Sequence, residues 1–495
     1  MLKTAKELTK DSGCLFPGRP DNRYEGAVFS PRRSTLWSSV QSARFDAGAS
    51  TRTELVRRSR YFEKNSDIYN RLADLFECYT VGCGLRLSPA SSDPDWNAAA
   101  LEEWQGWSRL PDLTSRQSLG TLWSLLARSW FVDGESFVIL TRGESNRPRL
   151  QVIEGHMVQT PPKLQDQEGT SIMDGVRIDT NGRPVGYYIG EDVNQNGRRE
   201  MVFREPTPAD FVVHVFEPSR PGQYRGLPFC YPVINKLHDL DDLQLLEMDA
   251  CKDAAKTTKT INTETGELSD MEFRRQQLSG SKTLNSGEDV SEERATYFKD
   301  VLGAETVVLR PDEKYEQFMT QRPSVATKEF WRCLKEDVCA GIGIPYVLAY
   351  PDSMQGTVYR GALDMANAFF RARSQVLIDA LLRTYEYVIS AARLYNPRLR
   401  DLPGDWRNAT VQPPRAVNVD VGRNSAAMLA ELEAGATNYE LIYSPLGLDW
   451  REVFRQRAAE EAFIKELGLT FAAGNKPQEQ PADNEDDVVP QAQYA

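Results

Sequence analysis

The chain lacks a long hydrophobic run, a secretory leader and a regular set of cysteines. No apolar stretch reaches the roughly 18 residues that a membrane-spanning helix needs, so we expect no membrane contact. The opening segment MLKTAKELTKDSG has lysines but no apolar core, which argues against secretion. The 7 cysteines are odd in number and scattered, a pattern typical of reduced thiols in a cytoplasm.

Signatures of common catalytic sites are also missing. The segment Gly280-Ser-Lys-Thr283 ends like a phosphate-binding loop, but it lacks the upstream glycine and follows no apolar strand. Gly134-Glu-Ser136 begins like a nucleophile elbow without the closing glycine. These absences argue against a P-loop ATPase and a serine hydrolase. Carboxylates are too numerous for any one pair to indicate a catalytic site.

Histidines and cysteines do not fall into a metal-binding pattern. The chain has 3 histidines, which are His156, His214 and His238. Cys78 and Cys83 have no second pair at zinc-ligand spacing. His214 lies in an apolar strand, where a hydrogen-bonded core residue is expected, and His238 stands among aspartates on a solvated helix face. We therefore expect no metal, no cofactor and no enzymatic activity, although a Cys–His nucleophile pair stays open because no pattern selects or rejects one.

The charge balance limits how the chain could bind nucleic acid. A net charge of -12 argues against a broad basic face that grips DNA. It is compatible with a channel through which DNA passes, because movement needs weak and even contact. On charge alone, a solvated acidic surface without any role in nucleic-acid binding is the more common alternative.

The hydrophobic periodicity predicts an α+β fold. Helical spacing runs from Thr53 to the glycines at 82 and 84, and again from Trp104 to Trp130. The latter, aromatic-rich block is a candidate for exposed contact patches. The middle of the chain alternates like strands, and Asn181-Gly182 predicts a hairpin turn.

One predicted helix is unusually long. Helical spacing continues from about Thr357 to Tyr395, and nothing in this range breaks the helix. At 1.5 Å per residue, a helix of about forty residues spans on the order of 60 Å. This length suits a structural strut better than an enzyme core.

The most specific segment is RPGQYRGLP, which follows the strand DFVVHVF and precedes a helical run. Physics alone predicts strand, irregular turn and helix. The order of residues in this segment resembles the signature of phage portal proteins of the lambda family. The motif residues are Arg220, Pro221, Gly222, Gln223, Arg225 and Gly226.

Further segments resemble the same family in the same order, over roughly residues 50 to 470. They are Val81-Gly-Cys-Gly-Leu85, Asp133-Gly134-Glu135, GVRIDTNGRPVGYYI, Gly343-Ile-Pro345, Arg360-Gly-Ala and Asp449-Trp. Asp449 is in addition a candidate helix N-cap with Glu452 three residues on. The ordered set is more specific than any single motif.

The resemblance implies a portal-like subunit with a mixed wing domain, long stem helices, a small clip and a helical, crown-like C-terminal region. The expected parts are an extended arm (1–50), wing (51–228), stem helix (229–259), clip (260–322), stem helix (323–344), tunnel loop (345–359), long helix with its return to the wing (360–413), C-terminal crown-like region (414–473) and disordered acidic tail (474–495).

The resemblance implies that residues 345–359 form the loop nearest the tunnel axis. Its expected DNA-facing residues are Asp352, Ser353, Met354, Gln355, Gly356, Thr357 and Arg360. Many relatives have Asn-Tyr-Ser-Ser before the arginine, whereas this chain has Gly356-Thr-Val-Tyr359, which leaves the DNA contacts of the loop open. From the residues alone, an ordinary connection between helices is an equally good interpretation.

The resemblance also implies a function. The subunit would form a ring of about twelve copies at one capsid vertex, through which double-stranded DNA enters and leaves the head. Expected partners are the terminase large subunit, the major capsid and scaffold proteins and the head–tail completion proteins, with assembly in the host cytoplasm and a final place in the virion. The alternatives are a metal-dependent hydrolase or nuclease, and another structural protein of a phage head or tail.

Overall fold

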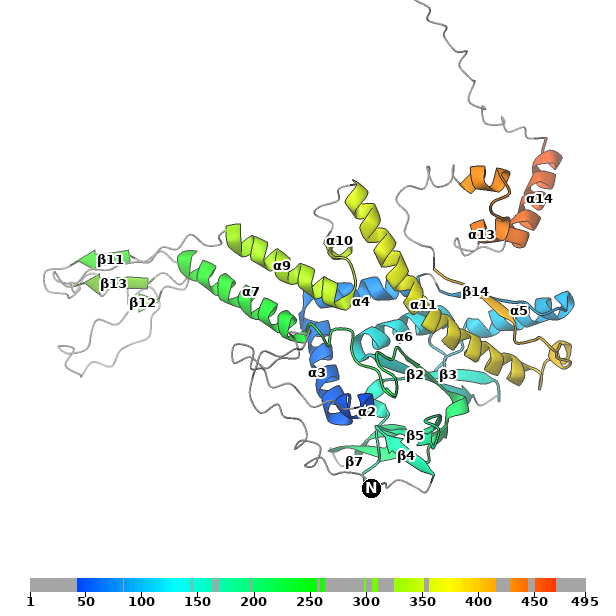
Figure 1. Ribbon diagram of the computed structural model, residues 1–495, viewed down its shortest axis with the longest axis horizontal. Helices are drawn as coiled ribbons and strands as arrows, with labels where there is room; N and C mark the ends of the chain where they lie inside the picture. The colour runs from blue at the N-terminus through cyan, green and yellow to red at the C-terminus, as the bar shows by residue number, and fades with distance from the viewer. Residues whose placement is uncertain are drawn as a thin grey trace, which may run out of the picture.

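The computed structural model describes residues 42–82, 84–143, 146–162, 164, 169–195, 198–255, 259–262, 298–299, 305–309, 325–350, 356–414, 428–443 and 450–468. The fold mixes helices and sheets, as expected (Figure 1). No helix within these ranges is long and apolar enough to cross a membrane.

The described part opens with three helices. They are α2 (Ala43–Asp46), α3 (Ala49–Asn65) and α4 (Asp67–Thr80). Residues 1–41 of the expected arm lie outside the described ranges, and residues 43–46 and 49–50 at its end are helical. The extended backbone of Ser66 separates α3 from α4. Apolar residues at helical spacing, including Leu72 and Phe76, bury one face of α4.

Two capped helices follow. In α5 (Pro94–Ser108) the carboxylate of Asp93 accepts hydrogen bonds from the backbone N–H groups of Asp95 and Trp96 at 3.0 and 3.1 Å. In α6 (Leu119–Asp133) the Ser118 hydroxyl caps the first turn. The expectation that the aromatic residues of this block form exposed patches is wrong. The side chains of Trp104, Trp123 and Trp130 are all buried, because apolar residues on both helices face the long helix and the sheet.

A three-stranded antiparallel sheet with the order β10-β2-β3 lies at the centre (Figure 1). Its strands are β2 (Glu135–Arg142), β3 (Pro148–Ile153) and β10 (Val212–Phe216). His214 is paired with Phe137 in the register of β10 and β2.

A second sheet has the order β4-β5-β6-β9 and lies on the side of β2 and β3 away from the long helix (Figure 1). Its strands are β4 (Thr170–Met173), β5 (Val176–Asp179), β6 (Pro184–Tyr187) and β9 (Thr207–Pro208). The predicted hairpin at Asn181-Gly182 is confirmed, since β5 and β6 are antiparallel and Gly182 has a φ of +82°. A small apolar cluster that includes Phe137, Val176 and Tyr187 fills the space between the two sheets.

Shorter elements complete this part of the chain. They are the hairpin β7 (Gly190–Gln195) and β8 (Arg198–Phe203), the pair β1 (Arg86–Pro89) and β14 (Ala409–Gln412), and the 3-10 turns η3 (Gly155–Met157), η4 (Ala209–Phe211) and η6 (Pro397–Leu399).

Two helices leave the centre side by side (Figure 1). They are α7 (Ile234–Ala255) and α9 (Val325–Ile342), called the α7–α9 pair below. Lys236 of α7 and Asp337 of α9 form an ion pair with a distance of 2.7 Å. Residues 229–233, at the start of the expected first stem helix, form consecutive turns before α7. Beyond the pair, the described strands β11 (Lys259–Asn262), β12 (Phe298–Lys299) and β13 (Glu305–Leu309) form a small sheet.

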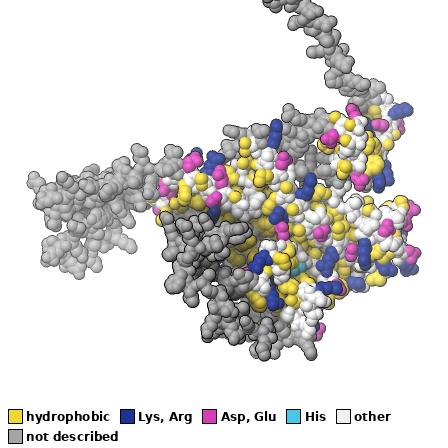
Figure 2. Space-filling view, in the orientation of Figure 1, with side chains coloured by type: hydrophobic (Ala, Val, Ile, Leu, Met, Phe, Trp, Pro, Cys, Tyr) yellow, Lys and Arg dark blue, Asp and Glu magenta, His cyan; other side chains and the backbone are white. Residues whose placement is uncertain are grey.

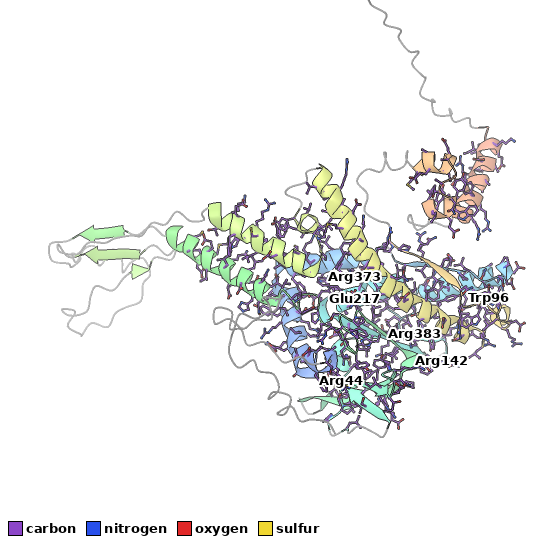
Figure 3. All side chains as sticks on the ribbon, viewed as in Figure 1. Arg44, Trp96, Arg142, Glu217, Arg373 and Arg383 are labelled. Atoms are coloured by element: carbon purple, nitrogen blue, oxygen red, sulfur yellow. The ribbon has the colours of Figure 1, made fainter. Side chains whose placement is uncertain are left out.

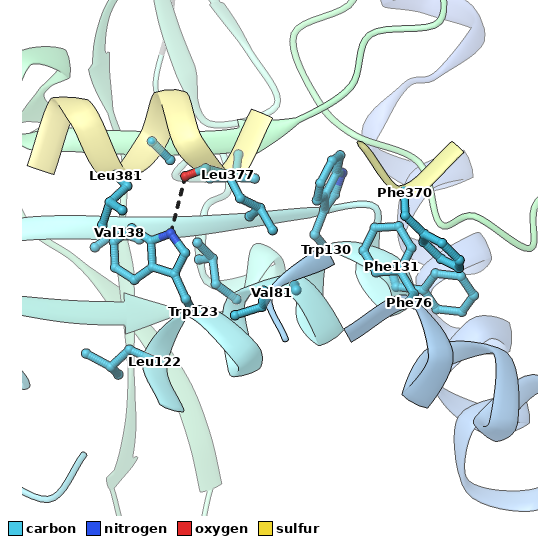
Figure 4. Close-up of a cluster of buried hydrophobic side chains, with 14 of the residues drawn as sticks. Phe76, Val81, Leu122, Trp123, Trp130, Phe131, Val138, Phe370, Leu377 and Leu381 are labelled. Atoms are coloured by element: carbon cyan, nitrogen blue, oxygen red, sulfur yellow. Dashed lines mark hydrogen bonds between the residues drawn. The ribbon is translucent and has the colours of Figure 1, made fainter. Parts of the chain in front are cut away.

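The long helix is confirmed as α11 (Gly356–Ala392), which follows the short helix α10 (Tyr346–Ala349). Its 37 residues span about 55 Å. It crosses the main sheet and packs on α4, α5 and β10. Figure 4 shows how Trp123 of α6 reaches α11, where the indole N–H donates to the carbonyl oxygen of Leu377 at 3.3 Å. We call this assembly of α3–α6, β1–β3, β10, α11 and β14 the central body.

The chain ends, within the described ranges, in helical residues 428–433, α13 (Tyr439–Tyr443) and α14 (Trp450–Glu466). We call residues 428–443 and 450–468 the C-terminal helices. Figure 1 draws them at one end of the molecule, away from the α7–α9 pair. The predicted acidic tail (474–495) lies outside the described residues.

Candidate functional site

The RPGQYRG motif forms a tight loop that lies against the turn between α6 and β2. Gln223 donates its backbone N–H to the carbonyl oxygen of Arg220 at 3.3 Å, and Gly222 has a φ of +78°. Proline followed by a residue with positive φ matches a type II turn. The side-chain oxygen of Gln223 accepts from the backbone and hydroxyl of Ser219 at 3.0 Å each. The motif therefore defines the shape of the loop through its own turn chemistry.

Two glycines allow the loop and the turn to touch backbone to backbone. Gly134 ends α6 with a φ of +85°. A Cβ atom at Gly134 would overlap the backbone of Leu227, and one at Gly226 would overlap the carbonyl of Gly134. The predicted turn at residues 133–135 is confirmed. The same contact between the two backbones requires glycine at both Gly134 and Gly226.

Glu135, the residue after this turn, is a fully buried carboxylate surrounded by donors. It accepts from Nε of Arg225 at 2.9 and 3.0 Å, and from Nη2 of Arg225 at 2.5 Å. The backbone N–H of Gly226 donates to it at 2.9 Å. Burial alone would raise the pKa of Glu135, but the Arg225 guanidinium and the bond from His214 hold that pKa well below its usual range. The carboxylate stays charged in the interior.

Arg225 connects the motif to the strands beside it. Besides Glu135, it donates to the carbonyl oxygens of Gly155 and Val158 at 2.8 Å each and to that of Asp174. Burial lowers the pKa of Arg225, but Glu135 outweighs burial, and the net shift is upward. A bidentate, fully bonded guanidinium is the geometry in which a buried ion pair can be tolerated.

Arg52 brings the first long helix to the same carboxylate. Its Nη1 lies 3.3 Å from Oε1 of Glu135, and its Nε lies 2.6 Å from the carboxylate of Asp174. Arg52, Arg225 and Glu135 expose at most 3% of their side chains. The cluster thus joins α3, the start of β2, the motif loop and the β4–β5 turn.

His214 completes the cluster. Its ring stacks between Phe137 and Phe216 with centroid distances of 4.2 and 4.3 Å. Its Nε2 lies 3.1 Å from Oε2 of Glu135. Burial lowers the pKa of His214 against the opposing effect of Glu135, so the neutral ring donates from Nε2. The expectation of a hydrogen-bonded core histidine is confirmed.

We call these five residues the buried ion cluster: Arg52, Glu135, Asp174, His214 and Arg225. Every charged group in it has a partner of opposite charge, so the cluster acts as a structural junction. The sequence singled out Arg225, His214 and the 133–135 turn separately. Arg52 and Asp174 were missed, because 83 or more residues separate Arg52 from its partners and no spacing rule connects them.

The remaining motif residue with a charge lies outside the cluster. Arg220 is half-exposed and forms an ion pair with Asp46 of α2. Asp449 lies outside the described residues, so its capping role stays a prediction. His238 is exposed and pairs with Asp242 on α7, which agrees with a solvated helix face.

Of the expected DNA-facing residues, Asp352, Ser353, Met354 and Gln355 lie outside the described ranges. Gly356 begins α11, Thr357 follows it, and Arg360 lies on the exposed side of its first turns. The structure therefore describes the two ends of this loop, but not residues 351–355 between them.

The preceding end of the loop is supported by aromatic contacts. The rings of Tyr346 and Tyr350 stack at 5.1 Å, and the Lys335 ammonium of α9 lies 4.5 Å from the Tyr350 ring. The loop therefore starts from the base of the α7–α9 pair.

The middle of α11 is held by a second set of contacts. The Arg373 guanidinium covers the Phe369 ring at 4.0 Å and forms an ion pair with Glu217 at 3.2 Å (Figure 3). Phe369 also packs against Gly343, whose φ is +96°. The end of α9, the end of β10 and α11 meet here.

A search for metal sites within the described ranges finds no group of three or more His, Cys, Asp or Glu side chains that could hold an ion.

Comparison with known proteins identifies the family. A sequence model of phage portal proteins, lambda family, matches residues 30–372. This range contains the buried ion cluster, the motif loop and the first half of α11.

Curated relatives agree. The chain is 24% identical to the portal protein of Escherichia phage N15 over 353 residues, 65% of this chain and 64% of the relative. It is 24% identical to portal protein B of Escherichia phage lambda over 367 residues, 68% and 67% of the two chains. A probable portal protein of Halomonas phage phiHAP-1 is 22% identical over 422 residues, 81% of this chain and 78% of the relative. The chain thus spans about two thirds of the first two relatives.

Solved structures with a similar arrangement come from gene transfer agent (GTA) particles. A chain of the native GTA virion has a TM-score of 0.45 at 14% identity, covering 80% of this chain and 93% of that one. A chain from the neck of the native GTA particle, computed with C12 symmetry, has a TM-score of 0.41 at 15% identity, covering 82% and 99%. The family assignment rests on the sequence match over residues 30–372, which is more than half of the chain. The chain belongs to the lambda family of phage portal proteins.

Proposed function

We propose that this chain is a portal subunit that forms a closed ring at one capsid vertex, through which double-stranded DNA is packaged and ejected. The family match over residues 30–372 carries the proposal. In this assignment the central body and the β4–β9 strands are the wing, the α7–α9 pair is the stem, and β11–β13 belong to the clip. A metal-dependent hydrolase, a nuclease or another head or tail protein is not favoured by any comparison.

The outer surface of the stem supports assembly into a ring. Leu245 and Leu246 of α7 expose 63% and 68% of their surface, and Phe330 of α9 exposes 54%. Figure 2 shows hydrophobic side chains over this region among acidic and basic ones. Large apolar side chains gathered on two adjacent helices are typical of a contact surface. If a different surface of a second copy packs on this one, the contact is head-to-tail, and such contacts form a ring when the rotation between copies closes.

The wing supports the same role in a different way. Its buried ion cluster joins five separate segments, and this supports a wing that acts as a rigid platform from which the stem projects. The ring of about twelve copies, the virion location and the partners (terminase large subunit, capsid and scaffold proteins, head–tail completion proteins) follow from the family and are part of the proposal.

The ring is tested by the mass of the purified chain in solution, measured by light scattering with negative-stain images of the same peak. We expect an annular particle many times heavier than the 55.9 kDa chain. A chain that stays monomeric or dimeric at every salt concentration contradicts the proposal.

The tunnel loop is tested by charge. Replacing Met354→Lys together with Gln355→Lys should leave rings intact and reduce the number of DNA-filled heads, because two lysines per subunit would hold phosphates in the channel. The control places lysines at two exposed wing positions, Asn65→Lys with Gln151→Lys. Normal packaging by the loop variant would contradict the assignment of this loop to the tunnel.

A further inference from the structure

The end of the central body opposite the α7–α9 pair is formed by three segments that contact one another (Figure 1). The connection after α5 (109–116) runs along β3, where the backbone N–H of Leu113 donates to the carbonyl oxygen of Leu150 at 2.8 Å. The turn between β2 and β3 reaches the end of α11, because the Arg147 guanidinium lies 5.1 Å from the Tyr395 ring. The three segments therefore present one continuous surface.

Six arginines gather on this surface, and Figure 3 labels one of them, Arg142, at the end of β2. They are Arg109, Arg116, Arg142, Arg147, Arg149 and Arg393, of which all but the half-buried Arg149 are exposed. The same segments contain no lysine and two acidic residues. Asp112 is buried and accepts from the hydroxyl of Thr114, and Glu144 lies outside the described residues. The surface is therefore positive in a chain whose net charge is -12.

The carboxylates beside this surface have other partners. Glu102 of α5 forms an ion pair with Arg398 at 2.7 Å. Glu103 accepts from the hydroxyl of Tyr395 at 2.9 Å and from the side-chain amide of Asn396 at 2.8 Å. Among the described side chains, no carboxylate forms an ion pair with any of the six arginines. Their positive charge is therefore available to a partner.

Three exposed leucines lie among the arginines. Leu110, Leu113 and Leu394 expose 50%, 40% and 68% of their surface. We call these three leucines and the six arginines the arginine tip. Contact surfaces between proteins are enriched in arginine, depleted in lysine and apolar at their centre. Nucleic acid is held chiefly through its phosphates, which lysine contacts as readily as arginine and which need no leucine. The arginine tip therefore suits a protein segment that has carboxylates beside apolar side chains.

The acidic tail of this chain contains such a segment. In Asp483-Asn-Glu-Asp-Asp-Val-Val489, four carboxylates stand before two valines. We call residues 483–489 the acidic segment, which lies outside the described residues. It has four negative charges and no positive one. It therefore complements the arginine tip both in charge and in its apolar part.

The C-terminal helices bring the start of the tail close to the arginine tip. Gln456 of α14 lines the same groove as Ser108 of α5, which directly precedes Arg109. Gly468, the last described residue, lies about 18 Å farther along at the helical rise. From there, 15 residues lead to Asp483 and span up to about 50 Å when extended. The acidic segment can therefore reach the arginine tip of its own chain.

We propose that the arginine tip binds the acidic segment of this chain, with the carboxylates on the guanidinium groups and the valines on the leucines. Guanidinium and carboxylate groups form paired, charge-assisted hydrogen bonds. Exposed ion pairs are individually weak, but several act together here, and the tether keeps the segment at a high effective concentration. The bound segment covers the arginines and lowers the affinity of this end of the subunit for nucleic-acid phosphates. The contact needs a single chain and does not depend on the proposed ring.

The test measures competition between the tail and a labelled peptide. The probe is a fluorescein-labelled peptide of residues 480–491, followed by fluorescence anisotropy at about 0.1 M salt. It is added to the unmodified chain and to a full-length chain with a neutral tail. The neutral tail carries Asp483→Asn, Glu485→Gln, Asp486→Asn and Asp487→Asn.

Two further variants of the neutral-tail chain locate the binding surface. The tip variant adds Arg116→Gln and Arg393→Gln, which change exposed residues. The matched control adds Arg57→Gln and Arg58→Gln on α3, which remove the same charge from another exposed surface. Thermal melts verify that both variants are folded before binding is measured.

We expect the neutral-tail chain to bind the peptide saturably, and the unmodified chain to bind it at least tenfold more weakly because its own tail occupies the arginine tip. The tip variant should bind at least fivefold more weakly than the neutral-tail chain, and the α3 control should change binding less than twofold. A peptide with Val488→Ser and Val489→Ser should bind at least threefold more weakly, since the leucines then lose their apolar partner.

The opposite results overturn the inference. A neutral-tail chain that does not bind the peptide, or binds it no better than the unmodified chain, shows that the tail is not the occupant. Equal binding by the tip variant and the α3 control shows general attraction between charges. Displacement of the peptide by short duplex DNA at a lower concentration than by unlabelled peptide shows that the arginine tip is a nucleic-acid surface. In each case the proposed function is unaffected, because the ring is tested separately by its mass.

Discussion

The central body and the C-terminal helices use the same kinds of side chain in opposite ways. The central body buries most of its tryptophans, and it also buries two arginines and a glutamate that form ion pairs inside the chain. The C-terminal helices bury no described residue and leave six large hydrophobic side chains exposed. The central body is thus stabilised by contacts within one subunit, whereas the C-terminal helices leave large hydrophobic side chains exposed.

The α7–α9 pair is intermediate between these two regions. At its base, Val233 packs directly on Gly341, and Lys236 pairs with Asp337. Farther along, Leu245 and Leu246 have no cover within the described chain. The pair is therefore anchored to one subunit at its base and open to a second along its length.

The largest expected effect is loss of the charge at the centre of the buried ion cluster. Glu135→Gln would leave the guanidinium groups of Arg52 and Arg225 with Asp174 as their remaining carboxylate. Breaking a buried ion pair in this way costs about 3–5 kcal/mol in the free energy of unfolding. Urea unfolding followed by tryptophan fluorescence measures it.

The control for this variant is Glu54→Gln, which removes an exposed carboxylate of α3 that pairs with Arg57 and Arg58. Exposed pairs contribute between about 0 and 1 kcal/mol. Equal stability losses in the two variants would contradict the structural role of the cluster.

A slightly smaller effect is expected where the two backbones touch. Gly134→Ala would place a Cβ against the backbone of Leu227 at a residue with positive φ. We expect a loss of about 2–3 kcal/mol in the free energy of unfolding, since both strain and overlap oppose it.

The matched control for Gly134 is Gly361→Ala in α11, where nothing lies within 4 Å of the new atom. A helical, exposed position should gain about 0.5–1 kcal/mol from alanine. Equal unfolding temperatures for Gly134→Ala and Gly361→Ala in a thermal melt would show that the loop does not need the close contact between the two backbones.

An effect of about 1 kcal/mol is expected from pH. The pKa of His214 is lowered in the folded chain, so the unfolded chain binds the proton more readily below its ordinary value of 6.5. Stability is therefore fully present above about pH 6.5 and falls as the pH decreases, by up to about 1.4 kcal/mol per pH unit. The lowered pKa of Glu135 adds a further loss once the pH falls below the ordinary glutamate value of 4.5.

His214→Gln should remove most of the loss between pH 7 and 5.5, as measured by urea midpoints at the two values. His238→Gln, which changes an exposed histidine on α7, should retain it. A His214→Gln variant with the same pH dependence as the unmodified chain would contradict a buried neutral ring.

The smallest effect on stability, together with a strong effect on assembly, is expected on the stem. Leu245→Ser with Leu246→Ser changes exposed residues, so the free energy of unfolding of the isolated subunit should shift by about 0.5 kcal/mol or less. Ring yield, measured by light scattering, should drop severalfold. Gln244→Ser on the same helix is the control, and equal ring yields in the two variants would contradict a stem contact.

Local features were predicted well from the sequence because their causes are local. The hairpin at Asn181-Gly182 and the turn at Gly134 depend on residues that favour positive φ. The long helix was predicted from about Thr357 to Tyr395 on helical spacing, and it is observed as Gly356–Ala392. The family resemblance came from short segments in a fixed order, and the match over residues 30–372 confirms it.

Features that depend on distant residues were not predictable in the same way. The tryptophans of α5 and α6 were expected at the surface, but α11 and the main sheet cover them. The partners of Glu135 come from α3, β10 and the motif loop, up to 91 residues away, and no periodicity relates such positions.

The sequence by itself determined the main elements, their order and the family. Turn residues, helical spacing and short motifs are patterns of a few neighbouring residues, so they can be read without the structure. Only the tertiary structure decided which charges are buried together and which hydrophobic faces are left uncovered. Burial is a property of how segments pack in space, so the junction at Glu135 and the exposed hydrophobic residues of the C-terminal helices became visible only when the chain was folded.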